Sequence, residues 1–365
     1  MNIKYPDYKN CIANLACSIM HYYGVTPPNA TFSAADEMLS KKYKNVVVIL
    51  LDGMGVKNME QHLLADGFFR RNMKCSYSST FPPTTVAATT AIDSGLFPNQ
   101  SAWLGWTGYF KEIDKNVVYF LNTDNDTGEE ITDFNIARTL VPYESIRDKI
   151  KEKGIDSYFI APFFEPFPRN YDDFCREIKT LCDMRASKYI YAYWDEPDLS
   201  MHEHGVDGDI IHYLLNNIEM ATKRLAGNLT DTLLIITADH GHINVHNEII
   251  TEYPDLTECL LRMPSMETRA LNLFIKKGME KQFEIAFHKH FKNKFLLFSK
   301  SEALEKQLFG FAPNHERLDD MLGDYIAVAI SDVAIENTVA KHKGSHAGLT
   351  EDEMTIPFIA VDLTN

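Results

Sequence analysis

The chain has 365 residues and a mass of 41.7 kDa, which suits one large α/β domain with a smaller insertion. Hydrophobic residues make up 45% and charged residues 24%, a composition that excludes disordered, collagenous and low-complexity classes. The formal net charge is −15 at pH 7. This acidic balance predicts no nucleic-acid surface, but it allows a small anionic substrate at a local cationic site.

The first residues of the chain do not resemble a targeting signal. They mix Lys4, Asp7 and Lys9 with short apolar pieces, without the basic-then-apolar order of a secretion signal. No stretch is long and apolar enough to span a bilayer. We therefore expect a cytoplasmic protein without a membrane partner. The six cysteines form no CxxC pair, which favours reduced core residues over a disulfide framework. The oligomeric state stays open.

Buried strands and helices alternate along most of the chain. Continuous apolar runs predict strands buried on both faces at Asn45–Leu51, Asp156–Ala161, Tyr189–Trp194 and Thr232–Thr237. Helical patterns occupy Tyr143–Glu152 and Asp209–Leu225. Thr355–Val361 resembles a last strand, in which Pro357 favours an edge or irregular position. This order predicts an α/β fold: a three-layer α/β/α sandwich with a mostly parallel central sheet.

One stretch departs from this rhythm and predicts a small inserted α+β cap at residues 262–312. It contains two strand-like and two helical segments, at Thr268–Ile275, Glu280–Phe291, Lys294–Ser299 and Ser301–Leu308. Residues 44–261 and 313–365 would then form the core. Residues 1–43 would form a helical extension packed on that core.

Polar residues of metal-ligand type follow three of the predicted strands. Ligands bind at the carboxyl ends of parallel strands, so we expect these residues at one edge of the sheet. The candidate metal ligands are Asp52, Asp198, His202, Asp239, His240 and His346. Carboxylate and imidazole together suit Zn²⁺, or alternatively Mn²⁺, and six ligands are enough for two ions. Asp198 and His202 are four residues apart, the spacing of one helix face.

Other histidines near these motifs are less clear. His204 and His242 lie two residues past His202 and His240. They are interpreted either as supporting or substrate contacts or as ordinary solvated or core histidines.

A threonine-rich segment, Ser78–Gly95, predicts a loop, a Pro-Pro stop and then a helix that begins near Thr84 or Thr85. A hydroxyl at a helix N-terminus lies beside free backbone N–H groups and the positive end of the dipole. That place suits an oxygen nucleophile attacking a phosphate. The alternative is a threonine that only caps the helix.

The ordered motifs resemble those of the alkaline phosphatase superfamily, and within it the type I phosphodiesterase/nucleotide pyrophosphatase branch. The resemblance covers residues 44–362. It implies that Asp52, Asp239 and His240 hold one metal, and that Asp198, His202 and His346 hold the other. The nucleophile of this superfamily typically lies ten residues before a glycine that ends its helix, which selects Thr85 before Gly95. Thr84 and Thr80 remain alternatives, because the Thr-Phe-Pro string at Thr80 resembles the local signature.

The chain departs from the family at the asparagine that usually binds a phosphoryl oxygen. Trp106 lies near that place, and Asn99 and Asn122 are possible substitutes. The aromatic loop Trp103–Phe110 could stack on a planar group or clamp core and cap together.

The resemblance implies a metal-dependent hydrolase of small phosphate esters. A phosphodiesterase or nucleotide pyrophosphatase is the first expectation, and a phosphomonoesterase or phosphonate hydrolase is the alternative. A hypothesis of another class is a metal-binding protein without catalysis.

Overall fold

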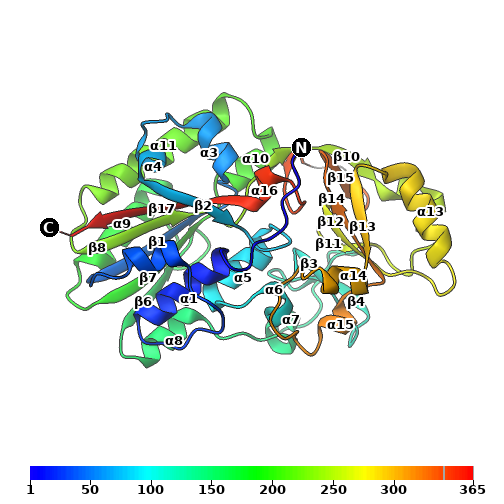
Figure 1. Ribbon diagram of the computed structural model, residues 1–365, viewed down its shortest axis with the longest axis horizontal. Coiled ribbons are helices and arrows are strands. Elements are labelled where there is room, and N and C mark those ends of the chain that lie inside the picture. The colour runs from blue at the N-terminus through cyan, green and yellow to red at the C-terminus, as the bar shows by residue number, and fades with distance from the viewer. Residues whose placement is uncertain (340–341, 365) are drawn as a thin grey trace.

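The computed structural model describes residues 1–339 and 342–364 and has two lobes, each built on its own sheet (Figure 1). The core sheet has the order β2-β17-β8-β1-β7-β6. Its strands are β1 Asn45–Leu51, β2 Met73–Ser78, β6 Asp156–Ile160, β7 Lys188–Trp194, β8 Thr232–Thr237 and β17 Thr355–Leu363. β6, β7, β1 and β8 run parallel, and β17 runs antiparallel to both its neighbours. The prediction of a mostly parallel α/β sheet is confirmed.

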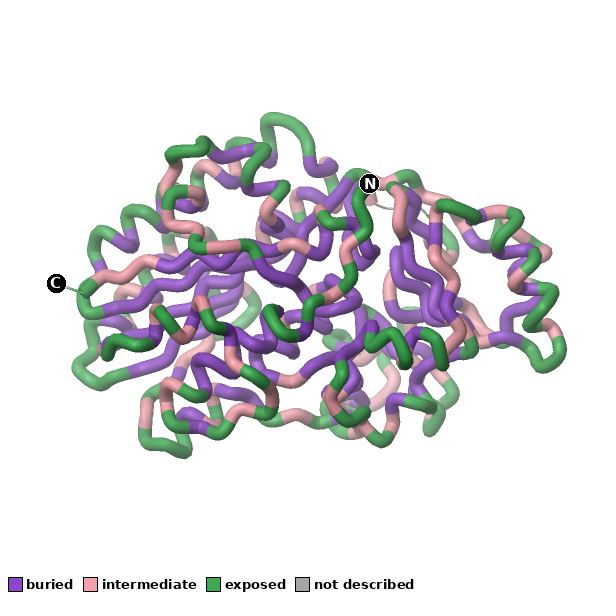
Figure 2. The backbone as a smooth tube through the Cα atoms, viewed as in Figure 1, coloured by how far each residue is buried: buried purple, intermediate pink, exposed green. Residues whose placement is uncertain are grey.

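Two groups of helices cover the core sheet (Figure 1). One group holds α1 Ile12–Tyr22, α5 Thr85–Ser94 and α8 Ile146–Glu152, and α2 Ser33–Met38 packs on α1. The other holds α3 Val56–His62, α4 Phe68–Asn72, α9 Tyr171–Asp183 and α11 Asp209–Ala226. Every residue of β1, β7 and β8 is buried, because helices lie on both faces of these strands (Figure 2).

In the last strand, the expectation of an edge or irregular position at Pro357 is met by an irregularity and not by an edge. Pro357 favours an edge, yet β17 lies inside the sheet, between β2 and β8. The irregularity is a register shift between Phe358 and Ile359, and pairing with β8 begins only at Ile359. The proline therefore stands outside the segment of β17 that pairs with β8.

The second sheet is antiparallel and has the order β13-β14-β12-β11-β3-β4-β5. Its strands are β3 Thr107–Phe110, β4 Lys115–Val118, β5 Thr123–Asp124, β11 Ser265–Met266, β12 Ala270–Leu273, β13 Phe295–Ser299 and β14 Tyr325–Ala329. α13 Glu280–Phe291 packs on it through Phe283, Phe287 and Phe291, on the outer side of the lobe (Figure 1). Shorter helices are α7 Ile136–Leu140, α12 Pro254–Thr257, α14 Lys300–Glu305 and α15 Leu318–Met321, with the 3₁₀ turn Ile250–Glu252.

This sheet reaches beyond the expected cap at residues 262–312. That range supplies β11, β12 and β13. β14 comes from a later segment of the chain, and β3, β4 and β5 come from a much earlier one. The link is the pairing of Met266 with Thr107, across more than 150 residues of chain. Strands of two to four residues carry too little periodicity to be recognised from sequence.

Short elements join the lobes. β9 Ile243–Asn244 pairs with β16 Gly344–Ser345, and β10 His246–Ile249 pairs with β15 Val333–Glu336. The remaining helices are α6 Pro98–Ser101, α10 Asp198–His204 and α16 Glu351–Met354. In the described part of the chain, no helix is both long and apolar enough to cross a membrane.

Candidate active site

Three adjacent strands, β7, β1 and β8, end in parallel register at one edge of the core sheet. Asp52 follows β1 at once, Asp198 opens α10 behind β7, and Asp239 lies two residues past β8. The continuous apolar runs that make these strands therefore also bring three carboxylates together.

Gly53 allows the chain to turn directly behind Asp52. Its φ is +74°, in the left-handed region. A Cβ atom here would lie 3.0 Å from the Met201 methyl carbon and 3.1 Å from Cβ of Asp198. The close approach of these two backbones thus depends on a glycine.

The first group of ligand atoms, the Asp52 cluster, consists of Asp52, Asp239 and His240, whose ligand atoms all lie within 4.8 Å of one another. All three residues are buried. Oδ1 of Asp239 accepts hydrogen bonds from the backbone N–H groups of Gly53 at 3.1 Å and His240 at 3.0 Å. Among the described residues, Oδ2 of Asp239 is buried without a hydrogen-bond partner, and Nε2 of His240 lies 3.7 Å from it. A buried carboxylate oxygen left in this way fits a bound cation.

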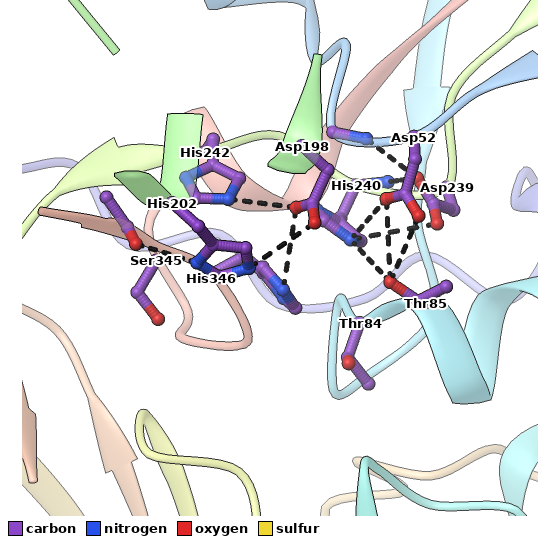
Figure 3. Close-up of polar contacts among 12 residues, drawn as sticks. Asp52, Thr84, Thr85, Asp198, His202, Asp239, His240, His242, Ser345 and His346 are labelled. Carbon is purple, nitrogen blue, oxygen red and sulfur yellow. Dashed lines mark hydrogen bonds and ion pairs between the residues drawn. The ribbon is translucent and has the colours of Figure 1, made fainter. Parts of the chain in front are cut away.

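The second group, the Asp198 cluster, consists of Asp198, His202, His242 and His346 (Figure 3). Nε2 of His202 lies 3.4 Å from Oδ2 of Asp198, and Nε2 of His346 lies 3.8 Å from Oδ1. Nδ1 of His202 donates to the Gly344 carbonyl at 2.9 Å, and Nδ1 of His346 donates to the Pro83 carbonyl at 3.1 Å. Because each Nδ1 carries the proton, each Nε2 carries a lone pair directed at the cluster. A neutral imidazole in this tautomer can ligate a metal.

The charge balance of the two clusters also fits divalent cations. Burial raises the pKa of Asp198 well above its usual range, and it raises that of Asp239 to about 8, with the nearby Asp52 carboxylate adding to the effect. Burial lowers the pKa of His202 to about 4 and that of His346 well below its usual range, so these imidazoles are neutral. In the Asp198 cluster, neutral imidazoles beside a carboxylate that resists ionisation form a site that a cation would stabilise. In the Asp52 cluster, against the lowering effect of burial, the Asp239 and Asp52 carboxylates raise the pKa of His240 to about 10, so a metal ion there would replace the imidazole proton. Both clusters could hold a metal ion.

Thr85 is the first residue of α5 and faces the Asp52 cluster. Its Oγ1 lies 3.4 Å from Oδ2 of Asp52 and 3.3 Å from Nε2 of His240 (Figure 3). Gly95, at φ +76°, ends the helix where the sequence places its end. The first-turn N–H groups of α5 lie beside this hydroxyl without helical acceptors.

The alternative threonines lie elsewhere. Thr84 caps α5, but its hydroxyl donates to Oε1 of Glu267 at 2.5 Å, away from both clusters (Figure 3). Thr80 is buried, and its hydroxyl donates to the Pro82 carbonyl at 3.4 Å.

All six predicted ligands lie in the two clusters, divided as the resemblance implies. Sequence reasoning left His242 undecided, whereas its imidazole belongs to the Asp198 cluster. The only hint in the sequence was that His242 lies two residues after the candidate ligand His240. His204 lies two residues after the candidate ligand His202, so this spacing could not distinguish the two histidines. His204 is not part of either cluster and lies beside Glu203 on α10.

The two asparagines considered as phosphate ligands are engaged in structural bonds. The Asn99 amide donates to the Ala312 carbonyl at 2.5 Å, and the Asn122 amide donates to the Thr132 carbonyl at 2.9 Å. Neither residue lines the cavity described next. The place near Trp106 instead presents Glu267, whose Oε1 accepts the Trp106 backbone N–H at 2.7 Å.

A cavity of about 1360 Å³ opens from the clusters between the two lobes. Asp52, Thr85 and His346 line one part of it, and aromatic rings line much of the rest, including Trp106, Phe120, Phe163 and Tyr193. Trp103 of the same aromatic loop is buried and packs on Tyr119. The loop is therefore mainly a clamp, with Trp106 turned to the cavity.

No protein-family model matches the sequence, and no curated protein matches it. Solved structures do: murine ectonucleotide pyrophosphatase/phosphodiesterase 5, in an inactive variant bound to AMP, shares 16% identity over 88% of each chain with a TM-score of 0.66. The same murine protein in another structure has a TM-score of 0.66 at 16% identity, over 86% of this chain and 87% of that one. The human protein has 0.64 at 17%, over 86% and 87%. The chain therefore has the fold of the nucleotide pyrophosphatase/phosphodiesterases.

Proposed function

We propose that this protein is a metal-dependent phosphodiesterase or nucleotide pyrophosphatase that uses Thr85 as its nucleophile. The observation that carries the proposal is the place of Thr85 Oγ1, 3.3 Å from His240 and 3.4 Å from Asp52, at the N-terminus of α5. A hydroxyl so placed is within reach of a phosphate that bridges the two clusters.

The comparisons support this reading in two ways. The murine relative binds AMP, and its inactive form carries alanine in place of threonine. In this chain the cavity beside Thr85 is wide enough for a nucleotide-sized ester and is lined by aromatic rings that suit a planar group.

The two clusters, Thr85 and the N-terminus of α5 would have separate roles in the proposed reaction. The Asp52 and Asp198 clusters would hold two divalent ions, with zinc as first choice and manganese as second, which would supply positive charge and favour deprotonation of a hydroxyl. Thr85 attacks phosphorus in line, and the bond to the leaving oxygen breaks, giving a phosphothreonine that water then hydrolyses. The free N–H groups and positive dipole of the first turn of α5 stabilise the phosphoryl oxygens.

The charges around the cavity favour a diester over a monoester. Asp126, Asp195 and Glu336 line it. Two arginines, Arg138 and Arg147, also line it, and Arg147 is already paired with Asp93 at 2.9 Å. Acidic walls repel a dianionic monoester more than a singly charged diester.

The test compares hydrolysis of bis-p-nitrophenyl phosphate with that of p-nitrophenyl phosphate, with Zn²⁺ or Mn²⁺ added. We expect diester preference and a loss of roughly a thousandfold or more in kcat for Thr85→Ala. Thr84→Val is the matched control, since its hydroxyl points to Glu267, and it should stay within about tenfold of the wild type.

Each other outcome has one meaning. A preference for the monoester would contradict the phosphodiesterase proposal and support a phosphomonoesterase with the same site. Absence of turnover with two metals bound would favour a binding protein. Unchanged turnover in Thr85→Ala would refute Thr85 as the nucleophile.

A further inference from the structure

His242 belongs to the Asp198 cluster by geometry, although the family resemblance gives it no role. It lies in the turn between β8 and β9 and is 1% exposed. Its Nε2 is 2.9 Å from Oδ1 of Asp198, closer than the 3.4 Å and 3.8 Å that separate the His202 and His346 nitrogens from that carboxylate. Figure 3 shows the His242 ring directed at Asp198, on the side of the carboxylate away from Thr85.

The backbone of His242 is held in place from two sides. The Asn58 side chain on α3 accepts the His242 N–H at 3.0 Å and donates to the His242 carbonyl at 3.0 Å. Gly344 closes the far side of the ring, where an added Cβ atom would lie 2.9 Å from Nδ1 of His242. The His242 ring is therefore buried and placed before any metal binds, as a metal ligand should be.

We propose that His242 is a fourth protein ligand of the metal held by the Asp198 cluster. The four residues offer one carboxylate oxygen and three imidazole nitrogens, all within 4.8 Å of one another. Among the described residues, the Asp52 cluster offers three such residues. The Asp198 cluster is therefore the tighter of the two sites, and it retains its ion when the Asp52 cluster has lost its own. This inference needs the metal binding of the proposed function but not its hydrolysis.

The competing role for His242 is a hydrogen bond alone. Its Nε2 would donate to Asp198 and orient that carboxylate, while Nδ1, which is buried without a partner among the described residues, would carry a lone pair. A glutamine at this position can donate the same hydrogen bond but replaces the imidazole nitrogen by an amide, which is a poor ligand. His242→Gln thus separates the two roles.

The experiment measures metal content and affinity in the full-length protein. Wild type, His242→Ala, His242→Gln and the control His204→Ala are loaded with Zn²⁺ and titrated with a competing chelator, and Co²⁺-loaded samples are compared by visible absorption. His204 is the matched control because it follows the candidate ligand His202 by two residues, as His242 follows His240, and it lies outside both clusters.

We expect wild type and His204→Ala to bind two ions per chain, one more tightly than the other. Both His242 variants should lose about a hundredfold or more in the affinity of the tighter ion and change one set of Co²⁺ bands. Wild-type affinity and spectrum in His242→Gln would overturn the proposal in favour of the hydrogen-bond role. Two ions in wild type with no change in His242→Ala would overturn this inference alone, whereas no bound metal in wild type would overturn the proposed function as well.

Discussion

A buried ion pair between Arg269 and Glu353 joins the two lobes of the protein. Both side chains are 0% exposed, and they form a two-point bond of 2.7 and 2.9 Å. Arg269 also donates to two carbonyls of the second lobe, those of Val333 and Ser331, at 2.7 and 2.8 Å. Glu353 in turn accepts the Gly348 N–H at 2.7 Å, two residues past His346.

Arg269→Met should therefore be strongly destabilising. It leaves Glu353 as a buried charge without its cation and frees one buried and one partly buried carbonyl, a combination that costs about 3–5 kcal/mol. We expect that loss in urea unfolding followed by tryptophan fluorescence. The matched control is Arg224→Met, which breaks a pair of similar length, 2.8 Å, with Asp172 on the surface, where both side chains are more than half exposed. It should cost no more than about 1 kcal/mol.

Two results would refute the reasoning behind this prediction. One is a loss in Arg269→Met that is no larger than in Arg224→Met. The other is a double variant, Arg269→Met with Glu353→Leu, as unstable as the single one, because removing both charges should recover part of the loss.

Two further predictions concern residues beside the site. Gly53→Ala should cost about 2–4 kcal/mol of stability, because it combines left-handed strain with the contact to Asp198, whereas Gly128→Ala, at φ +75° with nothing within 4 Å, should cost only the strain of about 1–2 kcal/mol. Equal losses in thermal or urea unfolding would contradict the close approach. Burial raises the pKa of Glu267 to about 7, so in metal-free protein the folded chain holds a proton that the unfolded chain releases above about pH 4.5, and stability falls as pH rises through this window. Glu267→Gln should be the more stable protein at pH 8, by up to about 3 kcal/mol, and should match the wild type near pH 4; an unchanged pH profile of urea unfolding would contradict this.

The elements predicted best are those whose apolar residues form a continuous run or recur at regular helical spacing. β8 begins and ends where its apolar run predicts, and α13 does so as well, because its phenylalanines recur at helical spacing. The second sheet could not be delimited in the same way. Its strands β3, β5 and β11 have two to four residues, and their pairing depends on contacts across the whole chain rather than on local pattern.

The part of the candidate site that follows the parallel strands directly was predictable from the sequence. Residues directly behind parallel strands must gather at one edge, which is why Asp52, Asp239 and His240 were expected to converge. The role of His242 depends instead on the direction of one turn and on the bonds from Asn58, which leave no trace in local sequence. For the same reason the place of Glu267, contributed by the second lobe, was not anticipated.

This division between the lobes has a consequence for how the protein works. The candidate metal ligands and Thr85 all come from the core or from the short segments that join the lobes, so the proposed chemistry would depend on the parallel sheet. The cavity wall facing them includes Trp106 and Glu267, which border the second sheet and are bonded to each other at 2.7 Å. Substitutions in that sheet should alter which ester enters far more than the reaction itself. The buried Arg269–Glu353 pair joins the two parts, so we expect its loss to change the width of the cavity between them as well as the stability of the fold.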